Sequence, residues 1–548
     1  MKHAKLLKSL VFGFGLLMSS ATEAATYYYT SFSPGGTRVV SSTSSATLVK
    51  STSKTWSGTM VVSGNVTITD RVEVSSGTDL ILLDGSELTC EAGIHVTDNK
   101  YLYVTAGNTT EDIQGTGLLI STVSSNEKAA IGGNQDEAGG VFVIYDGNVI
   151  ALNSYKGPWN GPGSAVIGGG YQGLGGMFRM RGGTLTAYTD YSNGGAIIGG
   201  GTGGSGGTIE IYDGTLVAYN GGGGTAATGA ILGGGWLGAG GNISISGGDI
   251  TVYSKYDEST NSQVTRGAAI GGGSSGAGGT INISGGTITA YGGWNANKSS
   301  GVHDIGQDAT VYGAVIGGGE NADGGTINIT GGTIKAVGAY TYEGKVYGAV
   351  IGGGQNGGCG TINISGGTIE AYSAYNCCTG ISCASTIGCG YEGSGGTITI
   401  DGTANIKAWN NTSETATVSG PALGDYEDAT CTIAIKGNHS VVNAYSIKNV
   451  ALNAAKMMAT AGNAAYYAHQ DYGTSESGTT AYSAKGTIDL STYGTQKFNC
   501  IYFTTSSTGI ERLEETEAAS TVYDLQGRQH SCLQNGLNIV NGRKIIKK

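Results

Sequence analysis

The chain is poor in proline, in charged residues and in histidine. Only 4 of its 548 residues are Pro, 13% are charged and six are His. Collagen needs abundant proline and a glycine at every third position, so the scarcity of proline excludes it. Acidic residues outnumber basic ones, 40 to 29. Because binding to phosphates requires clustered cations, we expect no nucleic acid partner.

Long hydrophobic runs are also missing, except at the N-terminus. That end carries Lys2, Lys5 and Lys8, followed by an apolar run from 10 to 18 and small residues up to Ala24. This pattern is typical of a secretory signal peptide over 1–24, with cleavage after Ala24. No Cys follows the run within the first 30 residues, so we expect no lipid-modified N-terminus. We therefore expect an exported chain without a transmembrane segment.

Glycine is abundant, with 102 residues, whereas an average protein has roughly 7% glycine. A flexible Gly/Ser linker would lack periodic apolar residues, and a disordered chain would be less hydrophobic than the 39% found here. The formal charge of -11 is modest for this length. The composition therefore favours a folded chain with a large core.

The glycines belong to an internal repeat. An Ile-Gly or Leu-Gly anchor is followed after ten residues by a second block, such as 280–284, and usually after seven more by a third block, such as 287–291. Nearly all length variation lies between the third block and the next anchor. The anchors are Ile131, Ile167, Ile198, Leu232, Ile270, Ile316, Ile351 and Ile387, with a degraded copy at Leu423.

Each block alternates apolar and polar residues, as a strand with one buried face does. In the second block Ile281 and Ile283 point inward, and Asn282 points outward. Glycines between the blocks supply positive φ at corners where a Cβ would clash. Since every unit resembles the previous one, each strand can pair with its copy one unit away. The sequence predicts an all-β fold, a single-stranded parallel β-helix (β-solenoid), right-handed by the general preference of parallel crossovers.

The remaining segments complete a domain plan. Residues 25–125 are expected to hold N-terminal strands and the first coils, and 126–446 the repeat β-helix. Residues 447–508 form a cap and strand-rich bridging segment, in which 450–461 is rich in helix formers and predicts a short helix or irregular cap. Residues 509–548 form a linker and a small C-terminal β domain.

Two resemblances add expectations. The tail Val522-Tyr-Asp-Leu-Gln-Gly-Arg, followed by Gly536-Leu-Asn-Ile-Val-Asn-Gly-Arg-Lys, resembles the C-terminal sorting domains of the Bacteroidetes type IX secretion system. Gln529 stands where relatives usually have a second basic residue. The resemblance implies that this machinery is a partner and that the chain crosses the outer membrane, to be attached or released. The repeats of 126–446 look like those of bacterial surface proteins described as adhesin-like or carbohydrate-binding, which implies no catalytic residue.

Catalysis has little support in the sequence. Parallel β-helices also carry pectin-degrading enzymes, but the Asn-Thr-Asp, Asp-Asp and Gly-His-Gly motifs of such hydrolases are absent. The repeats have one tight basic pair, Arg179 and Arg181, without a matching acidic stack. Isolated carboxylates at Asp146, Asp213 and Asp401 are interpreted as turn formers that bond to their own backbone, rather than as calcium ligands. The six histidines are scattered, so no spacing typical of zinc ligands appears. Taken with the missing hydrolase motifs, we expect no metal, no cofactor and no catalytic residues.

Aromatic residues give a better functional hypothesis. They end the third block on its outward side, interrupted by Leu152 and Val337, and stacked copies would form a ladder that packs against sugar C–H faces. The alternative is a structural stack partly roofed by the insertions. The insertion from 292 to 313, which contains Trp294, is a second candidate surface, as is the one from 254 to 266. The candidate ligand-binding residues are Tyr188, Tyr219, Tyr253, Tyr291, Tyr372, Trp409 and Trp294, and Tyr445 continues the ladder.

Five of the nine cysteines fall close together. Export favours disulfide stapling of this region over a metal site, although the pairing cannot be deduced from sequence. The candidates are Cys359, Cys377, Cys378, Cys383 and Cys389.

The sequence as a whole predicts a non-catalytic exported surface protein, an adhesin or carbohydrate-binding β-helix whose partner is a polysaccharide or host glycan. A structural spacer without a ligand is one alternative. A polysaccharide lyase or glycoside hydrolase is the other.

Overall fold

The computed structural model describes residues 25–157, 163–223, 226–257, 263–295, 308–340, 343–374, 381–411 and shorter stretches between 417 and 547. The predicted signal peptide, 1–24, lies outside the described residues. Within the described part there is no helix, and hence none long and apolar enough to cross a membrane.

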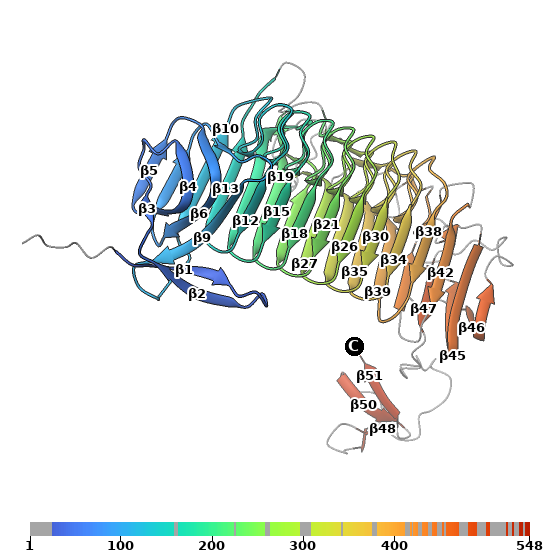
Figure 1. Cartoon of the computed structure of the whole chain (residues 1–548). Helices are drawn as coiled ribbons and strands as arrows, with labels where there is room; N and C mark the ends of the chain where they lie inside the picture. The colour runs from blue at the N-terminus through green and yellow to red at the C-terminus, as the bar shows by residue number, and fades with distance from the viewer. Residues whose placement is uncertain are drawn as a thin grey trace, which may run out of the picture.

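Three columns of parallel strands build an elongated solenoid, confirming the predicted parallel β-helix (Figure 1). The first column consists of the two-residue anchors. Its strands are β8 (Ile94–His95), β11 (Ile131–Gly132), β14 (Ile167–Gly168), β17 (Ile198–Gly199), β20 (Leu232–Gly233), β25 (Ile270–Gly271), β29 (Ile316–Gly317), β33 (Ile351–Gly352), β37 (Ile387–Gly388), β41 (Leu423–Gly424) and β44 (Leu452–Asn453).

The second column contains the second block of each repeat. Its strands are β4 (Thr55–Val62), β6 (Val72–Leu83), β9 (Tyr101–Asn108), β12 (Val141–Ile144), β15 (Met177–Met180), β18 (Thr208–Ile211), β21 (Asn242–Ile245), β26 (Thr280–Ile283), β30 (Thr326–Ile329), β34 (Thr361–Ile364), β38 (Thr397–Ile400) and β42 (Thr432–Lys436). The short β3 (Thr47–Leu48) pairs with β4.

The third column contains the third block. Its strands are β5 (Asn65–Ile68), β7 (Glu87–Cys90), β10 (Leu118–Val123), β13 (Asn148–Asn153), β16 (Thr184–Tyr191), β19 (Thr215–Gly223), β22 (Asp249–Tyr253), β27 (Thr287–Asn295), β31 (Thr333–Tyr340), β35 (Thr368–Ala374), β39 (Asn405–Asn411) and β43 (Val441–Tyr445).

Successive copies pair residue for residue. Ile281 of β26 lies opposite Ile243 of β21 and Ile327 of β30, and all three are fully buried. The outward position beside them forms a hydrogen-bonded ladder, in which Asn328 Nδ2 donates to Asn282 Oδ1 at 2.9 Å. The predicted inward and outward faces of the block are confirmed. The buried isoleucines form one continuous core, since every rung adds its apolar face to that of the previous rung.

Glycine fills the corners because neighbouring backbones stack too closely for a Cβ. At Gly271, where φ is 137°, an added Cβ would lie 1.9 Å from the carbonyl oxygen of Gly317 on the next rung. The left-handed residue five positions after each anchor is different, because here most units carry a side chain. These residues, all with φ between 60° and 66°, are Asp136, Gln172, Leu237, Ser275, Asn321, Asn356 and Glu392.

The insertions contain a further parallel sheet that the repeat pattern did not predict. Residues that precede the anchors pair from unit to unit, so part of each insertion is regular structure rather than free loop. The strands are β24 (Gln263–Thr265), β28 (Asp308–Val311), β32 (Glu343–Val346), β36 (Ile381–Ser382) and β40 (Thr417–Val418), and β23 (Tyr256–Asp257) pairs with β27.

The ends of the solenoid contain antiparallel pairs. Strands β1 (Tyr27–Phe32) and β2 (Arg38–Thr43) form a hairpin that pairs through β1 with β9. At the other end, instead of the helix or irregular cap expected over 450–461, strand β45 (Lys456–Gln470) pairs in parallel with β42 and so extends the second column by one strand. The helix prediction is wrong because the open edge of the last rung supplies backbone partners, and these outweigh local helix propensity.

The C-terminal strands are antiparallel. Strand β46 (Thr480–Asp489) pairs with β45, and β47 (Cys500–Thr504) with β43. A separate small antiparallel sheet consists of β48 (Val522–Tyr523), β49 (Gln529–His530), β50 (Gly536–Val540) and β51 (Arg543–Lys547). The small C-terminal β domain predicted from 509 on is therefore present.

Candidate functional site

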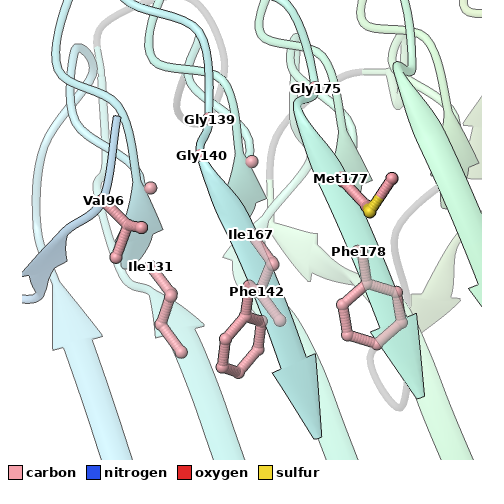
Figure 2. Close-up of a pocket in the computed structure, with 11 residues that line it drawn as sticks. Val96, Ile131, Gly139, Gly140, Phe142, Ile167, Gly175, Met177 and Phe178 are labelled. Carbon is pink, nitrogen blue, oxygen red and sulfur yellow. The ribbon is translucent and has the colours of Figure 1, made fainter. Parts of the chain in front are cut away.

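The interior of the solenoid is filled with side chains in the region drawn in Figure 2. Phe142 and Phe178 lie on successive rungs with ring centroids 5.9 Å apart, beside Ile131 and Ile167. The cavity among these residues measures about 10 Å³, which is about the space for one water molecule. A ligand of any size must therefore bind on the outer surface here.

The predicted aromatic ladder lies in register on the third column. Tyr188 lies opposite Tyr219, and their rings stack with centroids 5.0 Å apart and planes at 15°. Tyr253 and Tyr291 stack at 5.1 Å and 4°. These four tyrosines thus form two stacked pairs on one face of the solenoid.

Tyr256 from the insertion covers the middle of the ladder. Its ring centroid lies 5.3 Å from those of both Tyr219 and Tyr253. Burial raises the pKa of Tyr188 and of Tyr253. Further along, Tyr372 is only 8% exposed. The ladder is therefore partly roofed around Tyr219 and Tyr253 and buried at Tyr372, while its other described rings are half-buried.

The other ladder positions are in register as well. Leu152 pairs with Tyr188, and Val337 separates Tyr291 from Tyr372. Trp409 lies opposite Tyr372 with ring centroids 6.4 Å apart, and the backbone of Tyr445 continues the column. In the insertion, the backbone of Trp294 pairs with Tyr256 and Tyr340. The side chains of Trp294 and Tyr445 lie outside the described residues.

A second aromatic group, which the sequence did not reveal, lies where the β1–β2 hairpin meets the second column. We define the hairpin cluster as Phe32, Tyr145, Arg179, Arg181 and Tyr212. Phe32 at the end of β1 lies 5.5 Å from Tyr145, measured between ring centroids. Figure 1 shows the hairpin beside the strands of this column.

Polar contacts hold the hairpin in place. Thr30 Oγ1 donates to Asp146 Oδ2 at 3.0 Å, and Arg38 forms an ion pair with the same carboxylate. Asp146 also accepts from the amide of Gly147 at 2.9 Å. Asp213 and Asp401 likewise accept from the following glycine amide. The sequence interpretation of these carboxylates as turn formers is confirmed.

The two arginines of the hairpin cluster have different partners. Arg179 Nε donates to Glu210 Oε2 at 2.6 Å. The guanidinium of Arg181 lies 4.5 Å from the ring centroid of Tyr212 and 5.5 Å from that of Phe32. Tyr212 is 41% exposed, so its ring is open to solvent. The cluster therefore presents an aromatic surface beside a cation.

Burial raises the pKa of Tyr145, and the neighbouring arginines oppose that shift. The cluster escaped sequence analysis because its members lie in β1 and β15 or just beyond the ends of β12, β15 and β18, and the repeat gives no information on where the hairpin folds back. The tight basic pair Arg179 and Arg181 was the one feature of the sequence that could have pointed to this cluster.

A histidine bound by two carboxylates lies on the first rungs. His95 Nδ1 is 2.6 Å from Glu73 Oε2, and Nε2 is 2.7 Å from Glu137 Oε2. Partial burial raises the pKa of Glu73, but hydrogen bonds from His95 and Lys100 outweigh it and hold that pKa below its ordinary value. The pKa of Glu137 is lowered against burial by the Asn134 amide and by His95. Because the three residues come from successive rungs, the arrangement fastens these rungs to one another.

A third aromatic column lies on the glycine-rich edge. Arg266 Nη1 contacts both carboxylate oxygens of Glu320 at 2.6 Å and lies over the ring of Tyr312. Tyr312 stacks on Tyr347 with centroids 5.3 Å apart, and Tyr347 meets Tyr391 edge-on at 5.5 Å. The carboxylate of Glu320 therefore neutralises the charge of Arg266 within this column.

Cys359 and Cys389 are free thiols in the structure, Cys383 is half-buried just after β36, and Cys377 and Cys378 lie outside the described residues. Disulfide stapling stays a prediction. The Cys389 thiol donates to the buried carboxylate of Asp425 at 2.8 Å. Hydrogen bonding to Cys359, burial and Asp425 all raise the pKa of Cys389.

Within the residues that the structure describes, no group of three or more His, Cys, Asp or Glu side chains is arranged to hold a metal ion. An open cavity of about 380 Å³ lies beside the hairpin. It is lined by Thr30, Arg38, Val39, Val40, Glu111, Asp112 and Ile113.

Comparison with known proteins gives no relative from which a function could be carried over. No family model matches the sequence, and no characterised protein and no solved structure matches the chain.

Proposed function

We propose that this chain is a non-catalytic, exported surface protein that binds carbohydrate, with the hairpin cluster as its binding site. The observation that carries the proposal is the ring of Tyr212, which is 41% exposed and lies against the guanidinium of Arg181. The C–H face of a sugar packs on such a ring, while its hydroxyl groups accept hydrogen bonds from the arginine.

The ladder and the aromatic column on the glycine-rich edge fit this role less well. In the ladder, Tyr256 covers Tyr219 and Tyr253, and Tyr372 is 8% exposed. On the glycine-rich edge, the Arg266 guanidinium already donates a hydrogen bond to the carboxylate of Glu320. The hairpin cluster combines an exposed ring with an arginine that no carboxylate holds among the described residues.

Export is proposed on two sequence patterns, the signal-like segment 1–24 and the tail from Val522, which resembles type IX sorting domains. Together they favour passage across the outer membrane and a place on the cell surface or in the medium, as an adhesin or glycan-binding protein. Expression in the presence and absence of residues 522–548, followed by fractionation, tests this part. Export that is unaffected by the deletion would contradict the role of the tail.

Binding is tested with the purified chain on an array of polysaccharides and host glycans. We expect binding to at least one glycan, its loss in Tyr212→Ala, and its retention in Tyr372→Ala, whose ring is 8% exposed in the parent chain. Absence of binding to every glycan would favour a structural spacer. Degradation of a bound polymer, followed by reducing ends or unsaturated products, would favour a hydrolase or lyase instead.

A further inference from the structure

We propose that Arg181 makes the hairpin cluster selective for an acidic sugar, through the carboxylate of a hexuronic acid. This inference rests on the proposed function and specifies its ligand class. The first observation is that Arg181 lacks an oxygen partner within the described part of the chain. The other arginines whose side chains are described all have one, and they are Arg38 with Asp146, Arg71 with three backbone carbonyls, Arg179 with Glu210 and Arg266 with Glu320.

The second observation is the geometry of the guanidinium. Its central carbon lies 4.5 Å from the ring centroid of Tyr212 and 5.5 Å from that of Phe32. These ring contacts use none of the guanidinium N–H donors in a hydrogen bond to an oxygen of the described residues. Those donors form the fork that a carboxylate accepts in a bidentate manner.

The neighbouring charges leave this arginine available. Glu210, the carboxylate on the adjacent strand β18, is held by Arg179 at 2.6 Å. Asp146 is engaged by Arg38 and Thr30 at the base of the hairpin. The hairpin turn lies beside the arginine, since the Cβ position of Gly36 is 3.5 Å from Arg181 Nη1. Neither of these carboxylates therefore holds the Arg181 guanidinium.

The geometry also predicts how the sugar lies. The exposed Tyr212 ring is 4.5 Å from the guanidinium, so a pyranose that packs at this ring with its C6 edge toward Arg181 has its C6 substituent beside the arginine. A carboxylate at C6 gains charge-assisted hydrogen bonds, whereas a neutral group at C6 gains weaker ones. With a formal charge of -11, the chain as a whole repels polyanions, so selectivity must come from this local site.

The experiment compares each polymer with its own neutral form. The full chain is titrated with galacturonate and mannuronate oligomers, with the same oligomers after methyl esterification of the carboxylates, and with a sulfated galactan. We expect one uronate to bind at least about tenfold more tightly than its ester, as the loss of a charged hydrogen bond implies. This preference should weaken as salt rises.

Three variants test the arginine. Arg181→Gln should remove the preference for acid over ester, and Arg181→Lys should keep part of it, because lysine retains the charge but not the fork. Arg266→Gln is the matched control, an arginine over a tyrosine that already has a carboxylate partner, and it should leave the preference unchanged. Unfolding midpoints show whether each variant is folded.

The outcomes separate this inference from the proposed function. Binding of neutral glycans without any gain from the carboxylate, a preference that persists in Arg181→Gln, or selection of the sulfated polymer over both uronates overturns the carboxylate assignment and leaves carbohydrate binding intact. Failure of every polymer and every array glycan to bind overturns both.

Discussion

Replacing Gly271 with alanine tests why this chain needs so much glycine. The residue has a φ of 137°, and an added Cβ would lie 1.9 Å from the carbonyl oxygen of Gly317. The same oxygen accepts a hydrogen bond from the Gly272 amide at 2.9 Å. The methyl group can be accommodated only if two rungs separate at this corner, which breaks that hydrogen bond.

The cost has two parts. A side chain in this backbone region costs about 1–3 kcal/mol. Losing the hydrogen bond and leaving buried backbone groups without partners costs about 1–3 kcal/mol more. We expect Gly271→Ala to lower the free energy of unfolding by about 4 kcal/mol, a large part of the total for a typical domain.

Gly203→Ala is the matched control. This glycine also has a positive φ, 83°, but no atom lies within 4 Å of the position of its Cβ. The expected loss is that of a left-handed alanine alone, about 1–2 kcal/mol. Urea denaturation followed by far-UV circular dichroism measures both variants. If the two lose the same stability, close stacking of the rungs is not the reason for glycine at the anchors.

Three further predictions follow from the described contacts. Leu237 is 58% exposed and has a φ of 66°. Because Asn tolerates the left-handed region better than Leu, Leu237→Asn should raise the free energy of unfolding by about 1 kcal/mol. The midpoint of urea denaturation measures this change, and an unchanged midpoint would contradict it. Glu73 and Glu137 have lowered pKa values, so their stabilising effect is complete above their ordinary pKa near 4.5 and is lost as the pH falls through the lowered values. Between pH 5 and 3 the variant with both Glu73→Gln and Glu137→Gln should therefore lose less stability than the parent chain, as urea denaturation measures. Equal losses would show that these two carboxylates do not stabilise the fold through their ionised form. Burial raises the pKa of the Cys90 thiol to about 12, so at pH 8 iodoacetamide should label it only in denaturant, as peptide mass spectrometry would show.

The spacing of the repeat was enough to predict the architecture. Because the anchors at Ile270 and Ile316 must stack, the length difference between their units has to be absorbed elsewhere, and the structure pairs them residue for residue. The ladder register follows from the same constraint, so Tyr253 meets Tyr291 as expected. A period in the sequence becomes a column in space, which is why these predictions needed no tertiary information.

Features that break the period could not be predicted in this way. The hairpin approaches the solenoid through Thr30 and Phe32, and nothing in the repeat specifies which rung it meets. His95 and Glu137 are 42 positions apart and meet only because two rungs stack. Helix propensity gave a wrong prediction for the segment from Lys456, which pairs with the open edge of the sheet as a strand.

The outward face of the second column gives the strongest argument against a pure spacer. Stacking of rungs depends on the inward isoleucines and the corner glycines, so outward residues are free to vary. From β26 to β34 the outward position is asparagine, and Asn363 donates to Asn328 at 2.9 Å in a uniform ladder. Nearer the N-terminus the same face carries Arg179 and, just beyond the strands, Arg181 and Tyr212, beneath a hairpin tied down by its own contacts. A spacer needs no such group of arginine and aromatic side chains beneath a hairpin, so its presence favours this end of the solenoid as the proposed binding site.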